Sequence, residues 1–416
     1  MRTILHSDLN NFYASVECLR NPEIRNFPVV VVGSKEDRHG IVLAKNMIAK
    51  GYGVKTGDVY WEAKQKCGGT LIEVQADFST YIIVSREVRK IYEDYADRIE
   101  AYGIDECWLD VSSSLKLVGS GREIAETIRE RIKKEIGLTV SIGVSWNKIF
   151  AKLGSDMKKP DAVTVITPEN YKTKVWLLPV EDLLYVGKAT QQKLNRMGIK
   201  TIGDLAQADE QTLVNLLGKW GYYLHTFANG KDESPVTKIG EEEAIKSIGN
   251  SLTVYRDLVD DDDVEPVIYL LADSVSARMR ETGLNKARTV HVYARANNFV
   301  GYQKKGKLPR PSGTMQDIAK TAFKLFKEVY PWEKPVRSLG ISVSDFLFGN
   351  EQLDLFGDLE KDEKQKRLDN AIDKLRAKYG NNIIQVAIVF NDPKLKDLDI
   401  KGEHTIHPYS FFKNNK

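Results

Sequence analysis

The sequence predicts an α+β protein with two units, each in the order strand, helix, strand, strand, helix, strand. Three observations support this fold class. Strand-like apolar runs alternate with amphipathic helical patterns in residues 1–144, the same order returns in residues 245–347, and short helical patterns fill the segment between them. That order is typical of a ferredoxin-like fold. A chain of 416 residues is long enough to form several domains with separate cores.

The first unit begins with a predicted strand that ends at Asp8, where open α/β sheets place their ligands. An insertion follows, with predicted strands over residues 28–32 and 40–44 and a short helix that carries Lys45 and Lys50. These lysines suit triphosphate contacts, and a solvated helix face explains their spacing equally well. The unit continues with strands over residues 98–104, 107–111 and 139–144 and with a helix over residues 121–136, in which isoleucines recur every four residues.

Adjacent carboxylates, Asp105 and Glu106, lie at the junction of two predicted strands and are flanked by apolar residues. Two unit charges about 4 Å apart repel by roughly 4 kcal/mol at an effective dielectric near 20. Protonation, a basic neighbour or a divalent cation would relieve that repulsion, and so would a hairpin that turns the acids to opposite faces. The pair alone does not decide between these alternatives. Asp8 supplies a third carboxylate, and three acids are enough to hold two Mg²⁺ ions about 3.5–4 Å apart.

The middle of the chain, residues 178–234, is predicted to be a small helical unit. Gly187 and Lys188 lie in a tight turn between two helical patterns. The backbone N–H groups of such a turn can hold a phosphate oxygen without reading base sequence. An ordinary helical hairpin is the alternative, and the turn by itself favours it. Residues 237–244 resemble a linker.

The second unit carries a one-sided cluster of basic residues with Glu281 as its one acid. A cluster of this kind predicts contacts with a nucleic-acid backbone. In contrast, the acidic run at residues 260–263 is expected to begin a helix, because acids favour the N-terminal end of the helix dipole. The basic residues are Arg278, Arg280, Lys286, Arg288, Arg295, Lys304, Lys305, Lys307 and Arg310.

The C-terminal tail contains a short peptide with three bulky apolar residues in a polar, glycine-flanked segment. Gln352, Leu353, Leu355 and Phe356 within it are typical of a docking peptide, and a tail packed back on the protein is the alternative. A charged amphipathic helix over residues 361–379 and a strand-like run over residues 383–389 follow.

Composition excludes some classes of protein. The net charge of +3 does not by itself indicate a nucleic-acid partner, so the distribution of basic residues must do so. The three cysteines form no CxxC pair, which favours reduced thiols over disulfides. No leader pattern or membrane-length apolar run is present, so we expect a soluble, cytoplasmic protein without membrane association.

The motifs Asp8–Glu17 and Tyr102–Glu106 together resemble the Y family of translesion DNA polymerases, most closely its bacterial DNA polymerase IV branch. The similarity continues through Ser145–Lys148 and Met157–Pro160 to the turn Val186–Thr190, and it covers roughly residues 1–346. The resemblance implies a right-hand polymerase with a ferredoxin-like palm, small fingers, a helical thumb and a second ferredoxin-like domain, the little finger. The implied boundaries are 1–11 and 76–166 for the palm, 12–75 for the fingers, 167–236 for the thumb, 237–244 for the linker, 245–347 for the little finger, and 348–416 for a tail with a clamp-binding peptide at 352–356.

The resemblance also implies the roles of individual residues. Asp8, Asp105 and Glu106 match the catalytic carboxylates, which bind two Mg²⁺ ions together with the Leu9 carbonyl. Tyr13 matches the steric gate that excludes a ribose 2′-hydroxyl. The nucleotide-binding set is Phe12, Tyr13, Lys50 and Lys159; the DNA-binding set is Gly187, Lys188, Arg278, Arg280, Arg288 and Arg295; and the clamp-binding set is Gln352, Leu353, Leu355 and Phe356.

The implied activity is templated addition of dNMPs to a primer 3′-hydroxyl, with low fidelity, bypass of lesions and no proofreading. Implied partners are primer-template DNA, dNTPs and the β sliding clamp, and the expected state is a monomer. Departures from the family pattern include Asn10, Gly103, Leu43, Met47 and Lys50; Lys50 replaces an arginine and cannot make a bidentate contact. Two other functions stay open, a ferredoxin-palm nucleotide cyclase and a non-catalytic DNA-binding subunit recruited by the clamp.

Overall fold

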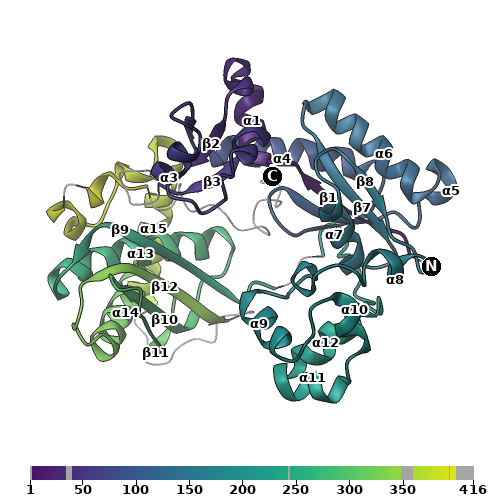
Figure 1. The fold of residues 1–416 in the computed structure, drawn as a ribbon. Coiled ribbons are helices and arrows are strands. Elements are labelled where there is room, and N and C mark those ends of the chain that lie inside the picture. The colour runs from purple at the N-terminus through teal and green to yellow at the C-terminus, as the bar shows by residue number, and fades with distance from the viewer. Residues whose placement is uncertain (1, 34–39, 242–243, 348–358, 393, 400–416) are drawn as a thin grey trace. The chain divides into compact units, whose positions relative to one another are not determined.

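The computed structural model describes residues 2–33, 40–241, 244–347, 359–392 and 394–399 (Figure 1). These residues form two compact units, one made of residues 2–33 and 41–241 and the other running from residue 244 to residue 399. The division falls inside the predicted linker. Within the described residues, no helix is both long and apolar enough to span a membrane.

The main sheet of the first unit has five strands in the order β5-β6-β1-β7-β8. Its central strand β1 (Ile4–Leu9) pairs antiparallel with β6 (Glu106–Asp110) and β7 (Val140–Ser145). The first and third strands of the predicted unit are therefore neighbours at its centre, as expected for a ferredoxin-like palm. The edges are β5 (Arg98–Ala101), which pairs with β6, and β8 (Val163–Val165), which runs parallel to β7.

Helices cover both faces of this sheet (Figure 1). On one face, α4 (Phe78–Glu93) and α6 (Gly121–Arg131) share a hydrophobic core with side chains of β1, β6 and β7. The predicted helix over residues 121–136 is regular only to Arg131 and ends in a π-helical turn, Ile132–Ile136. On the other face lies α7 (Lys148–Met157), which packs on β1 and β7.

Gly143 of β7 determines how closely α7 approaches the sheet. A Cβ atom at this position would lie 1.9 Å from the Ala151 carbonyl oxygen, so only glycine permits the observed contact. The close packing brings the polar side of α7 to the end of β1 that carries Asp8.

The insertion after β1 has its own small sheet, in the order β3-β2-β4. Its central strand β2 (Val29–Val32) is fully buried, between β3 (Val42–Lys45) and β4 (Ile72–Gln75). The Asn46 side chain accepts hydrogen bonds from the N–H groups of Ala49 and Val29, at 2.9 and 3.1 Å, and so caps one helix against this sheet. The helices are α1 (Phe12–Arg20), the 3₁₀ turn Pro22–Asn26, α2 (Met47–Gly51) and α3 (Tyr60–Lys66).

A group of short helices completes the first unit, with a core that includes Leu194, Leu205, Leu213 and Leu224. Trp146, which precedes α7, donates a hydrogen bond of 2.9 Å from Nε1 to the Gly230 carbonyl and ties this group to the palm sheet. The helices are α8 (Tyr171–Lys174), η3 (Val180–Asp182), α9 (Lys188–Arg196), α10 (Ile202–Gln207), α11 (Glu210–Leu217) and α12 (Lys219–Ala228), and α5 (Leu115–Val118) lies earlier in the chain.

The second unit has the predicted element order but a different strand order from the palm. It comprises β9 (Ser247–Leu258), α13 (Asp261–Glu281), β10 (Ala287–Ala296), β11 (Gly301–Ser312), α14 (Met315–Val329) and β12 (Val336–Phe346). The sheet order is β11-β10-β12-β9, so the second and fourth strands are central rather than the first and third. The reason is that the β10–β11 hairpin turns away from β9, and β12 then fills the gap between β9 and β10. Connectivity like that of a ferredoxin-like fold is confirmed, but its strand order is not.

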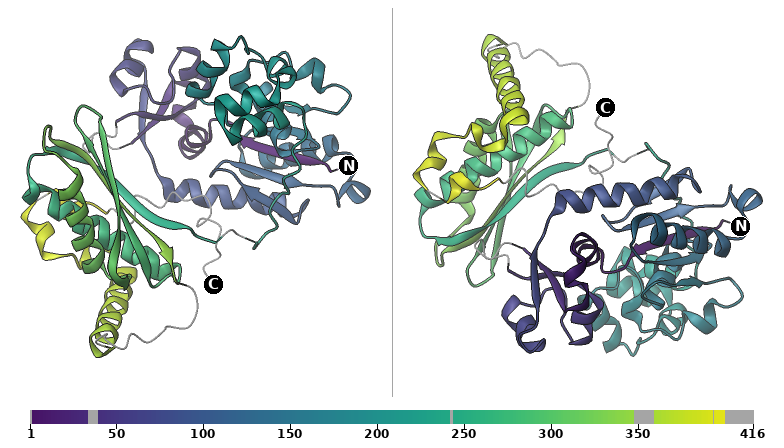
Figure 2. Two further views of the ribbon diagram at one scale, coloured as in Figure 1. Left: turned by 90° about the horizontal axis from the view of Figure 1, so that it is seen from below. Right: turned by 90° about the horizontal axis from the view of Figure 1, so that it is seen from above.

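Both long helices of the second unit cover one face of its sheet, where β9 and β12 contact α13 and β10 and β11 contact α14 (Figure 2). The acidic run begins α13 as predicted, with Asp260 as its N-cap: the Asp260 side chain accepts a 2.8 Å hydrogen bond from the Asp263 N–H. Among the described residues of this unit, no helix covers the other face of the sheet.

A C-terminal layer lies on the outer side of α13 (Figure 2). It consists of α15 (Leu359–Tyr379) and three 3₁₀ turns, Asn381–Ile383, Ala387–Asn391 and Leu395–Asp397. Val389 and Leu395 are buried in the core of the unit. The prediction of a strand over residues 383–389 is wrong, because this segment packs on a helix instead of a strand edge and satisfies its backbone groups within turns.

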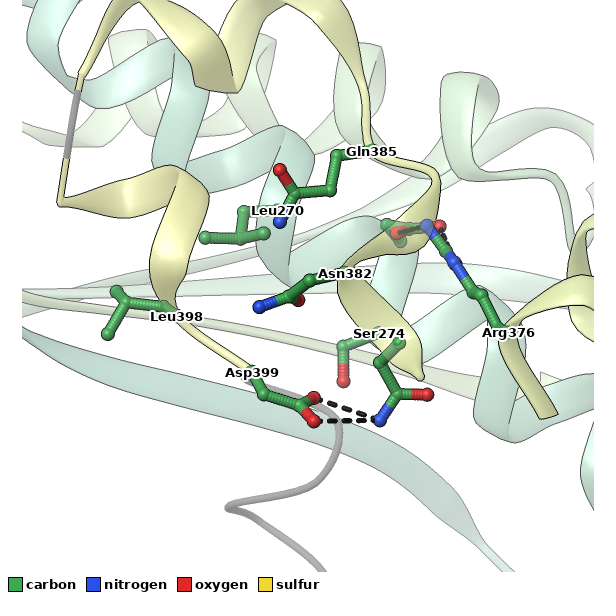
Figure 3. A pocket seen from close by; sticks show the side chains of 9 residues that line it. Leu270, Ser274, Arg376, Asn382, Gln385, Leu398 and Asp399 are labelled. Atoms are coloured by element: carbon green, nitrogen blue, oxygen red, sulfur yellow. Dashed lines mark hydrogen bonds and ion pairs between the residues drawn. The ribbon is translucent and has the colours of Figure 1, made fainter. Parts of the chain in front are cut away.

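Arg376 joins this layer to α13 in a small polar pocket (Figure 3). Its guanidinium donates to both carboxylate oxygens of Asp273, at 3.1 and 2.7 Å, and also to the Ile384 carbonyl, while its side chain is 6% exposed.

We expect Arg376→Ala to lower the free energy of unfolding by about 2–3 kcal/mol, because it leaves a largely buried carboxylate without its partner. Urea unfolding would measure the loss. The exposed Lys374, on the same helix, provides the control in Lys374→Ala, and an equal effect of the two changes would refute this role.

Candidate active site

Asp8 and Glu106 face each other across the β1–β6 ladder. Directly opposed residues in an antiparallel pair place their side chains on the same face, about 5 Å apart at Cβ. The Asp105 carbonyl accepts a 3.0 Å hydrogen bond from the Leu9 N–H, which holds the Asp105–Glu106 junction against the end of β1. The predicted strand, which ends at Asp8, is one residue too short, because β1 continues to Leu9. Asp8 and the Asp105–Glu106 pair, which are far apart in sequence, are thus neighbours in the fold.

Two lysines contact these acids, one from α7 and one from the segment that follows it. Lys152 Nζ is 3.4 Å from Asp8 Oδ2 and 3.0 Å from Glu106 Oε2, so one ammonium group contacts both carboxylates. Lys159 Nζ is 2.7 Å from Asp8 Oδ2. Both lysines also contact Asp156, at 3.3 and 2.9 Å. The acids are therefore partly neutralised by the protein itself.

Sequence reasoning assigned a role to Lys159 but missed Lys152, Asp156 and His6. His6 Nε2 lies 3.5 Å from Glu106 Oε2, and its Nδ1 is hydrogen-bonded to Ser155 at 2.8 Å. The signal that was available is the spacing of Lys148, Lys152 and Asp156 by four residues on a helix with apolar neighbours. Such spacing predicts one polar stripe. It does not say which sheet residues that stripe faces.

The three carboxyl groups differ in the direction of their pKa shifts. Burial and the charges of Glu106 and Asp8 raise the pKa of Asp105 to about 7. Burial and the charge of Glu106 also raise the pKa of Asp8, against the opposing effect of the two lysines. Burial would raise the pKa of Glu106 too, but contacts with His6 and Lys152 outweigh it and hold that pKa at about 2. Burial is thus the largest cause of the raised pKa values of Asp8 and Asp105, and the charge of Glu106 adds to it.

The fit of this cluster to a divalent cation rests on two observations. The Lys152 ammonium already shows that one cation can contact Asp8 and Glu106 together, and buried Glu106 Oε2 has ion-pair contacts with Lys152 and His6 but accepts no well-directed hydrogen bond. However, among the described residues no three His, Cys, Asp or Glu side chains are preformed as ligands of one ion. The donor set suits a hard cation of the Mg²⁺ type, provided that the ammonium groups of Lys152 and Lys159 move away from the acids.

Tyr13 lies in an aromatic cluster beside the acids. Its ring is stacked on Tyr81, with centroids 4.4 Å apart and planes 13° apart, and it makes a tilted contact with Phe12 and an edge contact with Phe78. The Tyr81 hydroxyl donates a 2.7 Å hydrogen bond to Glu17, which fixes the stacking surface. Burial and the Asp105 carboxylate raise the pKa of Tyr13 to about 12. The Tyr13 ring is therefore held rigidly near the carboxylates.

Comparison with known proteins decides the family. The chain matches the impB/mucB/samB family over residues 7–156, the C-terminal domain of that family over residues 245–355, and the DNA polymerase-iota thumb domain over residues 181–232. It is 52% identical to DNA polymerase IV of Acetivibrio thermocellus, covering 94% of this chain and 98% of that protein. It is 36% identical to DNA polymerase IV 2 of Bacillus subtilis, covering 92% and 93%. The chain belongs to the Y family of DNA polymerases.

A solved structure gives the same result. A Y-family DNA polymerase chimera superposes with a TM-score of 0.74 at 25% identity, covering 83% of this chain and all of the chimera. The chain is thus a DNA-directed DNA polymerase of the translesion type, with DNA and dNTPs as its substrates. Neither a nucleotide cyclase nor a non-catalytic subunit is favoured by these relatives. Y-family polymerases generally use divalent metal ions, which agrees with the acidic cluster.

Other predicted nucleotide contacts of the polymerase are on the insertion. Lys50 and Met47 are exposed on α2, and Leu43 is half-buried in β3.

Asn10, which departs from the family pattern, has a structural role here. Its Nδ2 donates to Ser141 at 2.9 Å and its Oδ1 accepts from the Asp161 N–H at 2.8 Å. An aspartate could accept the second bond but could not donate the first.

The predicted phosphate-binding turn lies at the start of α9 in the thumb-like helical group. Gly187 is the N-cap of α9, and no side chain caps that helix end. A Cβ atom on Gly187 would meet nothing within 4 Å, so the space in front of this turn is open. Lys188, the first residue of the helix, is exposed. Together these features suit a backbone contact with phosphate.

The helix-free face of the second unit's sheet carries basic and small polar side chains. Arg295 and Lys305 are exposed there, and His291 lies opposite Lys305 in the β10–β11 ladder. The neighbouring positions of β9 and β12 on this face hold small residues, which the sequence analysis did not single out. They are Ser247, Gly249, Ser251, Thr253, Ser338, Gly340, Ser342 and Ser344. We call this surface the open face.

Two of the predicted DNA-binding arginines do not lie on the open face. Arg278 and Arg280 are on α13, on the opposite side of the sheet. Arg278 donates a 2.7 Å hydrogen bond to the Gly249 carbonyl, and Arg280 forms an ion pair of 2.6 Å with Asp373 of the C-terminal layer. Both arginines are thus engaged in contacts within the protein and do not share a surface with Arg295, and their binding to DNA stays a prediction. Arg288 is exposed on β10, near Asp345.

Proposed function

We propose that Asp8, Asp105 and Glu106 bind two Mg²⁺ ions, with the Leu9 carbonyl as a further ligand, during templated addition of dNMPs to a primer 3′-hydroxyl. The observation that carries this proposal is the pairing of Asp8 with Glu106 around one shared cation, the Lys152 ammonium. Two such ions supply activation of the 3′-hydroxyl and neutralisation of the pyrophosphate leaving group.

The remaining residues of the site would bind and orient the nucleotide. Lys159 would leave Asp8 for the triphosphate, and Lys50 would add positive charge there. Phe12 and Tyr13 would lie under the sugar, where the rigid Tyr13 ring blocks a 2′-hydroxyl. Primer extension of one labelled oligonucleotide, with Mg²⁺ and with EDTA, tests the proposal. Full extension in EDTA, or none with any divalent ion, would overturn it.

We also propose the domain division of a right hand for this chain: palm 1–11 and 76–166, fingers 12–75, thumb 167–236 and little finger 245–347. The palm comprises the five-stranded sheet and the acids, and the fingers comprise the three-stranded sheet. A monomer suffices in this proposal, because all named site residues come from one chain. Sedimentation at micromolar concentration would test that state.

The open face of the little finger is the proposed contact with the DNA backbone, together with Gly187 and Lys188 of the thumb. We expect Arg295→Ala combined with Lys305→Ala to weaken primer-template binding about tenfold and to reduce the salt slope by about 2, because two phosphate contacts are lost. Fluorescence anisotropy at several salt concentrations would measure both quantities. Arg280→Lys on the helical side is the matched control; it keeps the charge there and should leave the salt slope unchanged. An unchanged slope in the double variant would exclude this face.

We propose that the peptide at residues 352–356 docks on the β sliding clamp. Gln352, Leu353, Leu355 and Phe356 lie outside the described residues, so this proposal rests on the sequence pattern alone. Replacing Leu355 and Phe356 by alanine should shorten the products made with the clamp by about tenfold and leave synthesis without the clamp unchanged. Product lengths on a primed circular template would measure this. Equal processivity of the variant and the parent chain would count against docking at this peptide.

A further inference from the structure

We propose that Lys152 is a built-in counterion that occupies the metal position of the ion-free polymerase and moves toward Asp156 when divalent ions bind. This inference rests on the proposed metal site and adds a residue to it. The Lys152 ammonium is close to three carboxylates, at 3.4 Å from Asp8, 3.0 Å from Glu106 and 3.3 Å from Asp156. Its side chain is only 13% exposed, so those acids, rather than water, stabilise its charge.

The arrangement of the acids explains why a counterion is needed. Asp8 and Glu106 are directly opposed at one end of the β1–β6 ladder, and Asp105 precedes Glu106 at that same end, so three acidic residues lie close together. Without a cation, ionised acids at this distance would destabilise the folded palm. Lys152 relieves the repulsion, and it occupies the gap between Asp8 and Glu106 that a divalent ion would need.

Asp156 supplies the second position for the ammonium. It lies one turn after Lys152 on the same helix, and its side chain is 45% exposed, which places it toward solvent relative to Asp8. A rotation of the lysine side chain alone would transfer the ammonium from the palm acids to Asp156. Lys159 also contacts Asp8 and Asp156, but its proposed destination is the nucleotide triphosphate. Lys152 has no proposed contact with the nucleotide, so its movement would depend on the metal ions alone.

Binding of Mn²⁺ to the full-length protein, measured by calorimetry without DNA or nucleotide, tests this inference. Asp105→Asn identifies the heat that belongs to the active site and not to surface acids. We expect Lys152→Met to tighten the active-site dissociation constant about tenfold, because the competing charge is removed. Lys152→Met should also lower the melting temperature of the protein in EDTA. Addition of Mn²⁺ should restore most of that loss. A purely structural lysine would lower the melting temperature equally in both conditions.

Three further variants make the test specific. Lys148→Met is the matched control, because Lys148 is on the same helix, is also 13% exposed and pairs with Glu100 at 2.6 Å instead of the palm acids. This substitution should leave the Mn²⁺ affinity unchanged. Lys152→Arg keeps the charge and should bind Mn²⁺ no more tightly than the parent chain. Asp156→Asn removes the second position and should weaken binding, a result that stands even if Lys152→Met fails to fold.

The outcomes separate this inference from the proposed function. Unchanged Mn²⁺ affinity in Lys152→Met, or tighter binding in Asp156→Asn, would overturn the counterion while leaving the metal site in place. Absence of any Mn²⁺ heat that depends on Asp105 would instead overturn the metal site itself.

Discussion

Asp105→Asn should reduce primer extension by at least about a thousandfold, which corresponds to about 4 kcal/mol of lost transition-state stabilisation. An amide has almost the same shape as a carboxylate, but it lacks the negative charge that holds a divalent ion. The Asp105 backbone is tied to Leu9 by a hydrogen bond that the substitution leaves intact, so the fold should survive. Single-turnover extension with saturating dNTP would measure the rate.

The same measurement needs a control on the same strand. Asp110 lies at the other end of β6, opposite Ile4, and its side chain accepts hydrogen bonds from Ser112. Asp110→Asn should therefore leave the extension rate within about twofold. Primer-template affinity should be unchanged in both variants. Near-normal extension by Asp105→Asn would exclude this residue as an essential metal ligand.

Tyr13→Ala should let the polymerase incorporate ribonucleotides, with its preference for deoxyribonucleotides reduced by about 100-fold, or about 2.7 kcal/mol. The effect should be large because the ring cannot move aside: it is stacked on Tyr81, which is itself anchored to Glu17. The ratio of kcat/KM for dNTP and rNTP, with the same template base, would measure the change.

Tyr13→Phe is the matched control for that experiment. It keeps the ring and the stacking on Tyr81 and removes only the hydroxyl, so the preference for deoxyribonucleotides should persist. If Tyr13→Ala discriminated between the sugars as well as the parent chain does, another group would have to be the gate.

Much of the fold could be predicted from local patterns. The strands and helices of both βαββαβ units follow from the periodicity of apolar residues, and Asp260 at the start of α13 follows from capping chemistry. Strand order could not be predicted in the same way. Whether the β10–β11 hairpin turns toward β9 or away from it changes none of the local patterns, and so the different sheet of the little finger was not foreseen.

The candidate site also contains residues that local patterns predict and residues that they do not. Asp8, Asp105, Glu106 and Tyr13 could be named from motifs, because a polymerase needs these residue types at these points of the chain. The misplaced pair, Arg278 and Arg280, shows the limit of that approach, since a cluster in sequence does not say which face of a sheet each arginine occupies. Asp373, the ion-pair partner of Arg280, lies 93 residues further along the chain.

The sequence by itself therefore determined the family, the element order and the three carboxylates, because each depends on residue identity and short-range periodicity. Only the tertiary structure decided that one ammonium group, from Lys152, lies between two of those carboxylates. That contact depends on the absence of a side chain at Gly143, which lets α7 rest directly on the sheet. Packing distances of this kind join residues that no local pattern connects.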